Sequence, residues 1–144
     1  ARTALASLPD VSEGLENVLY EKARSCTDYP AFLAAVKTKR YTLARLRRIS
    51  MHALLGVDKA FFARHPAPRY LRVLGLRRDA LALLSALSER ASLPVVTGYQ
   101  DYAALDGMAK EQFALDLFAG ELLSMAAPAP EAASSEFSRP LLIV

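Results

Sequence analysis

The fold class is decided by residues 70–97, YLRVLGLRRDALALLSALSERASLPVVT. Residues 70–76 have the length and residue types of a strand, and Pro94-Val95-Val96-Thr97 reads as a second short strand. Between them, Asp79 caps a predicted helix whose buried side carries Ala80, Leu83, Leu84 and Leu87. A strand, a helix and a strand at this spacing predict a right-handed parallel crossover.

Three helices are predicted ahead of this unit. The first begins at Asp10, whose carboxylate caps the first turn together with Glu13. The second begins at Asp28, and the third covers about residues 42–55 and ends at Gly56. The second helix has an apolar stripe that we expect to be buried, made of Tyr29, Phe32, Leu33 and Val36.

A last helix is predicted over about residues 109–124, followed by a surface loop at 126–135 and a possible edge strand at 141–144. The predicted fold is therefore mainly α with a small parallel β-sheet (α+β). An N-terminal three-helix segment precedes a β-α-β unit and a C-terminal helix. We expect residues 1–144 to form a single domain.

The charge of the chain is distributed unevenly. The formal net charge is only +3, but residues 1–100 carry 16 Lys and Arg against 8 Asp and Glu. Residues 101–144 carry two basic residues against seven acidic ones. A basic region of this kind favours a surface that faces a polyanion.

Several function classes find no support in the composition. No apolar run approaches the roughly 20 residues that a membrane span needs, and the N-terminus lacks the layout of a secretory signal. We therefore expect a cytoplasmic protein without a membrane partner. The single cysteine, Cys26, leaves zinc without thiolate ligands, and the scattered glycines form no phosphate loop. We assign no catalytic residue and no metal ligand.

The densest functional signal is the segment KTKRYTLARLRR at residues 37–48, which holds six cations and no carboxylate. At 100° per residue, Arg45, Arg48 and His52 lie on one helix face, opposite a predicted core face. Arginine is planar and bidentate and therefore suits phosphate oxygens, and Tyr41 could stack on an unpaired base. The alternative is an ordinary solvated helix face.

Arg72 lies inside a predicted strand, where it either extends the basic face or pairs with a carboxylate. The candidate RNA-binding residues are Lys37, Lys39, Arg40, Tyr41, Arg45, Arg47, Arg48, His52 and Arg72. Both His65, in a loop, and Cys26, on an apolar stripe, receive no functional role.

Four strings of this sequence resemble one protein family. They are Pro9-Asp10-Val11-Ser12-Glu13-Gly14-Leu15-Glu16-Asn17, Val36-Lys37-Thr38-Lys39-Arg40-Tyr41-Thr42, Arg45-Leu46-Arg47-Arg48-Ile49 and Tyr70-Leu71-Arg72-Val73-Leu74-Gly75. In this order they resemble the C-terminal domain of bacterial tRNA(Met) cytidine acetate ligase, a family often labelled as nucleotidyltransferase-like. The resemblance covers about residues 8–124, and the Lys-Thr-Lys-Arg-Tyr-Thr string is its most specific part.

The resemblance implies a two-domain parent enzyme. In that family an N-terminal nucleotidyltransferase-type domain uses ATP and acetate to form acetyl-adenylate, and the acetyl group passes to N4 of the wobble cytidine of elongator tRNA(Met). The C-terminal domain helps to hold the tRNA. The catalytic half depends on a His-x-Gly-His element, which neither His52 nor His65 provides here. We therefore expect the tRNA-binding part of a longer ligase, inactive without its N-terminal catalytic domain.

Two alternatives stay open at this stage. The basic segment could complete an ATP site at the interface with the catalytic domain, which the same cations would suit. The basic segment could also dock on an acidic protein, which would make the chain a protein–protein interaction module. Residues 101–136 of a second copy of this chain are one such acidic surface.

Overall fold

The computed structural model describes residues 1–12, 14–128 and 135–144. The chain forms two compact units, Ala1–Pro66 and Ala67–Val144, whereas the sequence led us to expect one. The boundary falls at residues 65–68, His-Pro-Ala-Pro, where two prolines prevent a helix from continuing. Each unit has its own apolar core, and each is described by itself below.

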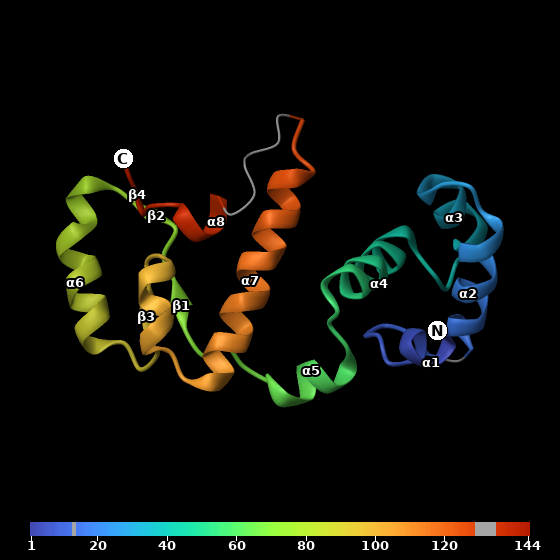
Figure 1. Ribbon diagram of the computed structural model, residues 1–144, viewed down its shortest axis with the longest axis horizontal. Coiled ribbons are helices and arrows are strands. Elements are labelled where there is room, and N and C mark those ends of the chain that lie inside the picture. The colour runs from blue at the N-terminus through green and yellow to red at the C-terminus, as the bar shows by residue number, and fades with distance from the viewer. Residues whose placement is uncertain (13, 129–134) are drawn as a thin grey trace. The chain divides into compact units, whose positions relative to one another are not determined.

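The described part of the first unit contains helices and no strand (Figure 1). Its helices are α1 (Arg2–Ala6), α2 (Leu15–Ser25), α3 (Tyr29–Val36), α4 (Leu43–Leu55) and α5 (Lys59–Arg64). Side chains cap three of them: Asp28 accepts from the Ala31 amide, Thr42 from the Arg45 amide and Asp58 from the Phe61 amide. The predicted second and third helices are thereby confirmed. The buried core consists of Leu8, Val11, Leu15, Leu19, Leu33, Val36, Leu46 and Ile49.

The predicted start of the first long helix is wrong. Helix α2 begins at Leu15, five residues after Asp10, and its N-cap is Gly14 in a left-handed conformation. Asp10 itself lies in a turn, with a φ of 64°, and its carboxylate pairs with Arg48 instead of capping a helix. The part of the prediction that concerns Glu13 falls outside the described residues. Asp10 has a different role, which is described with the candidate site.

The expected buried stripe of α3 is confirmed only in part. Leu33 and Val36 are buried and Phe32 is half-buried against the core. Tyr29 is 48% exposed, because α3 is only two turns long and its first residue lies beyond the core. The exposed ring becomes important below.

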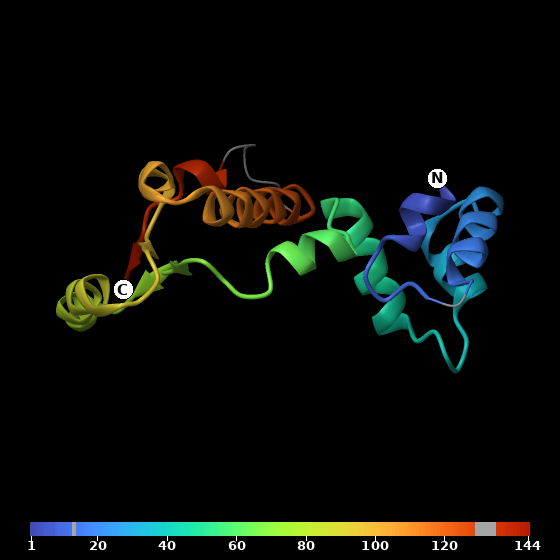
Figure 2. The same cartoon turned by 90° about the horizontal axis from the view of Figure 1, so that it is seen from below.

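The second unit contains the predicted strand–helix–strand arrangement, but two predicted details of its helix are wrong. Asp79 pairs with Arg77 and does not cap the helix, and Leu83, predicted to be buried, is 69% exposed. Strand β1 (Leu71–Arg72) pairs in parallel with β3 (Val95–Val96), with Leu71 opposite Val95, and helix α6 (Leu81–Arg90) connects them. The strands lie between α6 and α7 (Gly107–Met125) in both views (Figures 1 and 2). The single strand predicted at 70–76 is in fact two: β2 (Gly75–Leu76) pairs in parallel with β4 (Leu142–Ile143), which confirms the predicted edge strand.

The remaining elements of the second unit complete its core. They are the 3-10 turns η1 (Arg78–Ala80) and η2 (Tyr99–Ala104) and the helices α7 (Gly107–Met125) and α8 (Ser135–Ser138). Helix α7 confirms the predicted last helix and begins at Asp106, which accepts from the Ala109 amide at 2.7 Å. Its buried face packs with the end of β3 through Val96, Leu105, Ala109, Phe113 and Leu117. Within the described ranges, the structure therefore has the α+β class that the sequence predicts.

Candidate nucleic-acid interface

The loop between α3 and α4 holds its cations at the tip of a closed turn. The Thr38 amide donates to the Tyr41 carbonyl at 3.1 Å, and the Tyr41 amide donates to Thr38 Oγ1 at 3.0 Å. These two hydrogen bonds fix both ends of the turn, so Lys39 and Arg40 occupy its exposed centre. The turn therefore presents two neighbouring positive charges to solvent.

Two further cations flank this turn. Lys37 is the C-cap of α3, with its amide bonded to the Leu33 carbonyl at 3.0 Å, and Arg47 lies in the second turn of α4. Both are exposed. The side chains of Lys37, Lys39 and Arg47 make no hydrogen bond or ion pair with any residue that the structure describes. We call Lys37, Lys39, Arg40 and Arg47 the basic cluster.

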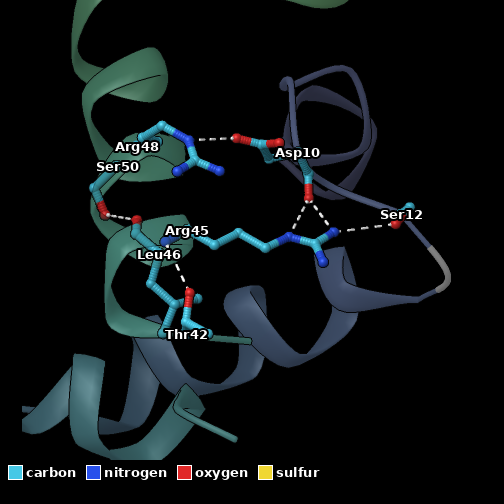
Figure 3. Close-up of polar contacts among 7 residues, drawn as sticks. All are labelled: Asp10, Ser12, Thr42, Arg45, Leu46, Arg48 and Ser50. Atoms are coloured by element: carbon cyan, nitrogen blue, oxygen red, sulfur yellow. Dashed lines mark hydrogen bonds and ion pairs between the residues drawn. The ribbon is translucent and has the colours of Figure 1, made fainter. Parts of the chain in front are cut away.

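Arg45 and Arg48 behave differently, because both bind Asp10 (Figure 3). Arg45 donates from Nε and Nη2 to the Asp10 carbonyl, at 2.9 and 2.5 Å, and from Nη2 to Ser12 Oγ at 3.2 Å. Arg48 Nε lies 3.0 Å from Asp10 Oδ2. We call this arrangement of Asp10, Ser12, Arg45 and Arg48 the Asp10 clasp. It ties the segment before α2 to α4, across 35 residues of sequence.

Tyr41 supports the arginines of the loop and of the clasp. Its ring packs against the core of the first unit and is half-buried. The Arg40 and Arg45 guanidinium carbons lie 5.9 and 5.3 Å from the ring centroid, within the range of cation–π contacts. These contacts occupy the ring that the sequence suggested for base stacking.

His52 shares a helix with the clasp but makes other contacts. Its ring meets Phe62 edge-on, with 5.7 Å between centroids, and the ring is half-buried. His52 Nδ1 is buried and has no hydrogen-bond partner among the described residues. The surroundings of His52 are thus largely apolar.

Arg72 belongs to the second unit, and of its two sequence alternatives the structure shows the carboxylate pairing. Its guanidinium lies 3.0 Å from Asp116 Oδ2 and 2.9 Å from Glu136 Oε2, with only 15% of the side chain exposed. Burial lowers the pKa of Arg72, but the hydrogen bonds to Glu136 and Asp116 outweigh it and raise the pKa above its ordinary value. Arg72 therefore has an internal structural role.

Tyr70 completes this buried network. Its hydroxyl donates to Asp116 Oδ2 at 3.0 Å. Burial, and secondarily the charge of Asp116, raises the pKa of the Tyr70 phenol above its ordinary value of 10.0. Tyr70 and Arg72 thus share one carboxylate as a common acceptor.

Two kinds of feature are absent from the described residues, a metal site and a membrane-spanning helix. No group of three or more His, Cys, Asp or Glu side chains is placed to hold a metal ion. None of the helices in this part of the chain is long and apolar enough to span a bilayer.

The sequence matches the HIGH Nucleotidyl Transferase family over residues 1–137, and the chain belongs to that family. Over most of its length it is homologous to tRNA(Met) cytidine acetate ligases. It is 35% identical over 133 residues to that of Thermoanaerobacter sp. (strain X514), which covers 92% of this chain and 33% of the relative. The ligase of Thermotoga maritima is 33% identical over 131 residues, which covers 83% of this chain and 31% of the relative.

Solved structures show the same fold. A crystal structure of Thermotoga maritima TmcAL bound with alpha-thio ATP matches 99% of this chain and 38% of that one, with a TM-score of 0.90 and 28% identity. An apo form of the same protein also has a TM-score of 0.90, over 100% of this chain. The chain therefore spans about a third of the length of the relatives that it matches. The resemblance of the sequence to this family is confirmed as homology over most of the chain, and its assignment to the C-terminal domain stays a prediction.

Proposed function

We propose that this chain is the tRNA-binding part of a longer, cytoplasmic ligase that uses ATP and acetate to acetylate the wobble cytidine of elongator tRNA(Met). The rest of that protein would supply the catalytic nucleotidyltransferase domain with its His-x-Gly-His element, which this sequence lacks. Homology to tRNA(Met) cytidine acetate ligases over 92% of the chain supports the reaction. The basic cluster supports the proposal that this chain binds the tRNA.

One observation carries the proposal. Three exposed cations of the basic cluster, Lys37, Lys39 and Arg47, have no partner in the described structure. An isolated protein gains nothing by concentrating positive charge without counter-charges, since like charges repel. RNA phosphates are the complementary surface, and each contact releases counterions from the RNA.

The geometry divides the candidate residues into two groups. Lys37, Lys39, Arg40 and Arg47 are exposed and would contact phosphates directly. Arg45 and Arg48, held by Asp10, would position α4 and its loop, while Tyr41 supports the arginine stems. His52 lies on the same helix, and the proposal gives it no phosphate contact.

Titration of this chain with elongator tRNA(Met) tests the proposal. Lys39→Gln and Arg47→Gln should each weaken binding severalfold at low salt, because each removes one phosphate contact. Lys22→Gln and Arg90→Gln are matched controls, since both side chains are exposed and make no hydrogen bond or ion pair in the described structure. If the four variants all bind like the unmodified chain, the basic cluster does not contact tRNA.

One observation favours a second candidate function. The Thermotoga maritima relative was solved with alpha-thio ATP bound, and the exposed cations of the basic cluster would equally suit the phosphates of ATP. In this case the cluster would complete the ATP site of the longer enzyme. Arg47→Gln in the full-length enzyme would then raise the KM for ATP and leave the KM for tRNA unchanged. The first proposal expects the reverse.

A further inference from the structure

A groove lies beside the basic cluster, between α3 and α4. Its walls are formed by Tyr29, Pro30 and Leu33 of α3 and by Leu43 of α4, and the cations of Lys37 and Arg47 line it as well. Its volume is about 430 Å³. Small-molecule sites occupy roughly 300–1,000 Å³, so the groove is large enough for a nucleotide.

The aromatic wall of the groove is rigid and accessible. Tyr29 is 48% exposed, and its ring stacks on Phe32 with 6.3 Å between centroids and 21° between planes. Phe32 is itself packed against the core, so it backs the tyrosine and limits its motion. Pro30 follows in the same wall and has a fixed backbone φ. A backed, exposed aromatic ring is the platform on which unpaired bases stack.

The charges of the groove are all of one sign. Lys37 and Arg47 are cationic and have no partner in the described structure, and none of the described lining residues is acidic. The nearest carboxylate in sequence, Asp28, caps α3 by accepting from the Ala31 amide at 2.8 Å. An aromatic ring beside two free cations matches the two halves of a nucleotide, the base and its phosphate.

We propose that this groove binds one unpaired nucleotide of an RNA strand. The base stacks on Tyr29, and the adjoining phosphate lies between Lys37 and Arg47. Lys37 belongs to both the groove and the basic cluster, so a strand that follows the exposed loop leads directly to the groove. This inference rests on the proposed RNA-binding function and adds a subsite to the same surface.

The test measures binding of a fluorescent single-stranded pentaribonucleotide of mixed sequence to this chain at several salt concentrations. Tyr29→Leu should weaken binding between about fivefold and 150-fold, because it removes one base-stacking platform. The slope of log K against log salt should not change, since no charge is lost. Tyr29→Phe keeps the ring and should bind like the unmodified chain. Lys37→Gln should instead make this slope shallower by about 0.7, because one phosphate contact is lost.

Tyr99 offers a matched control. It is 42% exposed and stacks on Tyr102 at 5.4 Å, but it belongs to the second unit and not to the groove. Tyr99→Leu should leave binding unchanged, and an equal loss in Tyr99→Leu and Tyr29→Leu would overturn the proposal. Circular dichroism of Tyr29→Leu checks that the helices persist.

Failure of the subsite and failure of the proposed function give different results. If Tyr29→Leu binds as tightly as the unmodified chain while Lys37→Gln and Arg47→Gln weaken binding, the RNA surface is real and the stacking subsite is not. If the unmodified chain binds neither the pentaribonucleotide nor tRNA, both proposals fail. Tight binding of AMP alone, with no gain from the longer strand, would overturn the strand assignment and assign the groove to a free nucleotide.

Discussion

Asp10 is the position at which the structure makes its most specific energetic prediction. Its backbone is left-handed, with φ 64°, and it joins α4 through two different groups. The carboxylate pairs with Arg48, and the main-chain carbonyl accepts from Arg45. Substitutions of these three residues should therefore have separable costs.

The magnitudes follow from exposure and from backbone geometry. The Arg48–Asp10 pair is 59% and 35% exposed, so Arg48→Ala should cost about 0.2–1 kcal/mol. Arg45 is half-buried and makes charged hydrogen bonds, so Arg45→Ala should cost more, about 1.5–3 kcal/mol.

Glycine and alanine should differ at position 10. Both substitutions remove the ion pair with Arg48. Alanine in the left-handed backbone conformation costs about 1–2 kcal/mol, a cost that glycine does not have. The greater freedom of glycine in the unfolded chain offsets about 0.4–1 kcal/mol of this. We therefore expect Asp10→Gly to be more stable than Asp10→Ala by about 1 kcal/mol, the reverse of the usual order in a helix.

Hydrogen exchange of the α4 amides is the suitable assay, because it reports the opening of the first unit separately from the second. A difference of about 1 kcal/mol corresponds to a roughly fivefold difference in the opening equilibrium. Two results would refute the reasoning: Asp10→Ala as stable as Asp10→Gly, or Arg48→Ala more damaging than Arg45→Ala.

Three further predictions concern stability. The pKa of Tyr70 is raised above 10.0, so above that pH the unfolded chain loses the phenolic proton while the folded chain keeps it. The second unit should therefore lose stability as the pH rises above about 10. Denaturation at pH 9 and pH 11 should show a smaller loss in Tyr70→Phe, and an equal loss would contradict this. Arg72→Met should destabilise the second unit by about 3 kcal/mol, measured by urea denaturation, because it removes a partner of the buried Glu136 carboxylate. A cost below about 1 kcal/mol would contradict this and show that Arg139, 3.1 Å from Glu136, is enough to neutralise that carboxylate. Gly56→Ala should destabilise α4 by about 1 kcal/mol, measured by hydrogen exchange, because Gly56 has a φ of 68°. The added Cβ itself has open space, so the cost would come from the backbone alone, and an unchanged stability would refute the role of this left-handed C-cap.

Much of the fold was predictable from local sequence signals. Asp28, Thr42 and Gly56 mark helix ends by the chemistry of their own residues, and the structure has ends at those positions. The parallel pairing of β1 with β3 follows from strand length and spacing. The division into two units was not foreseen, because it depends on which cores form and not on any one residue type.

The site was predictable only where it is local. The basic cluster falls within one short stretch, residues 37–48, so composition alone reveals it. The partner of Arg45 and Arg48 is not local, because Asp10 lies 35 and 38 residues before them and its residue type is also typical of a helix cap. Likewise, the exposure of Tyr29 depends on where the core ends along α3, which helical periodicity does not specify.

The most direct test of the central claim is the salt dependence of elongator tRNA(Met) binding to this chain. It compares the unmodified chain with a triple variant, Lys37→Gln, Lys39→Gln and Arg47→Gln. If these three cations contact phosphates, the slope of log K against log salt should become shallower by about 2 to 3, at roughly 0.7–0.9 per contact. Equal slopes for the two proteins would contradict the claim and place the RNA contacts, if any, elsewhere on the chain.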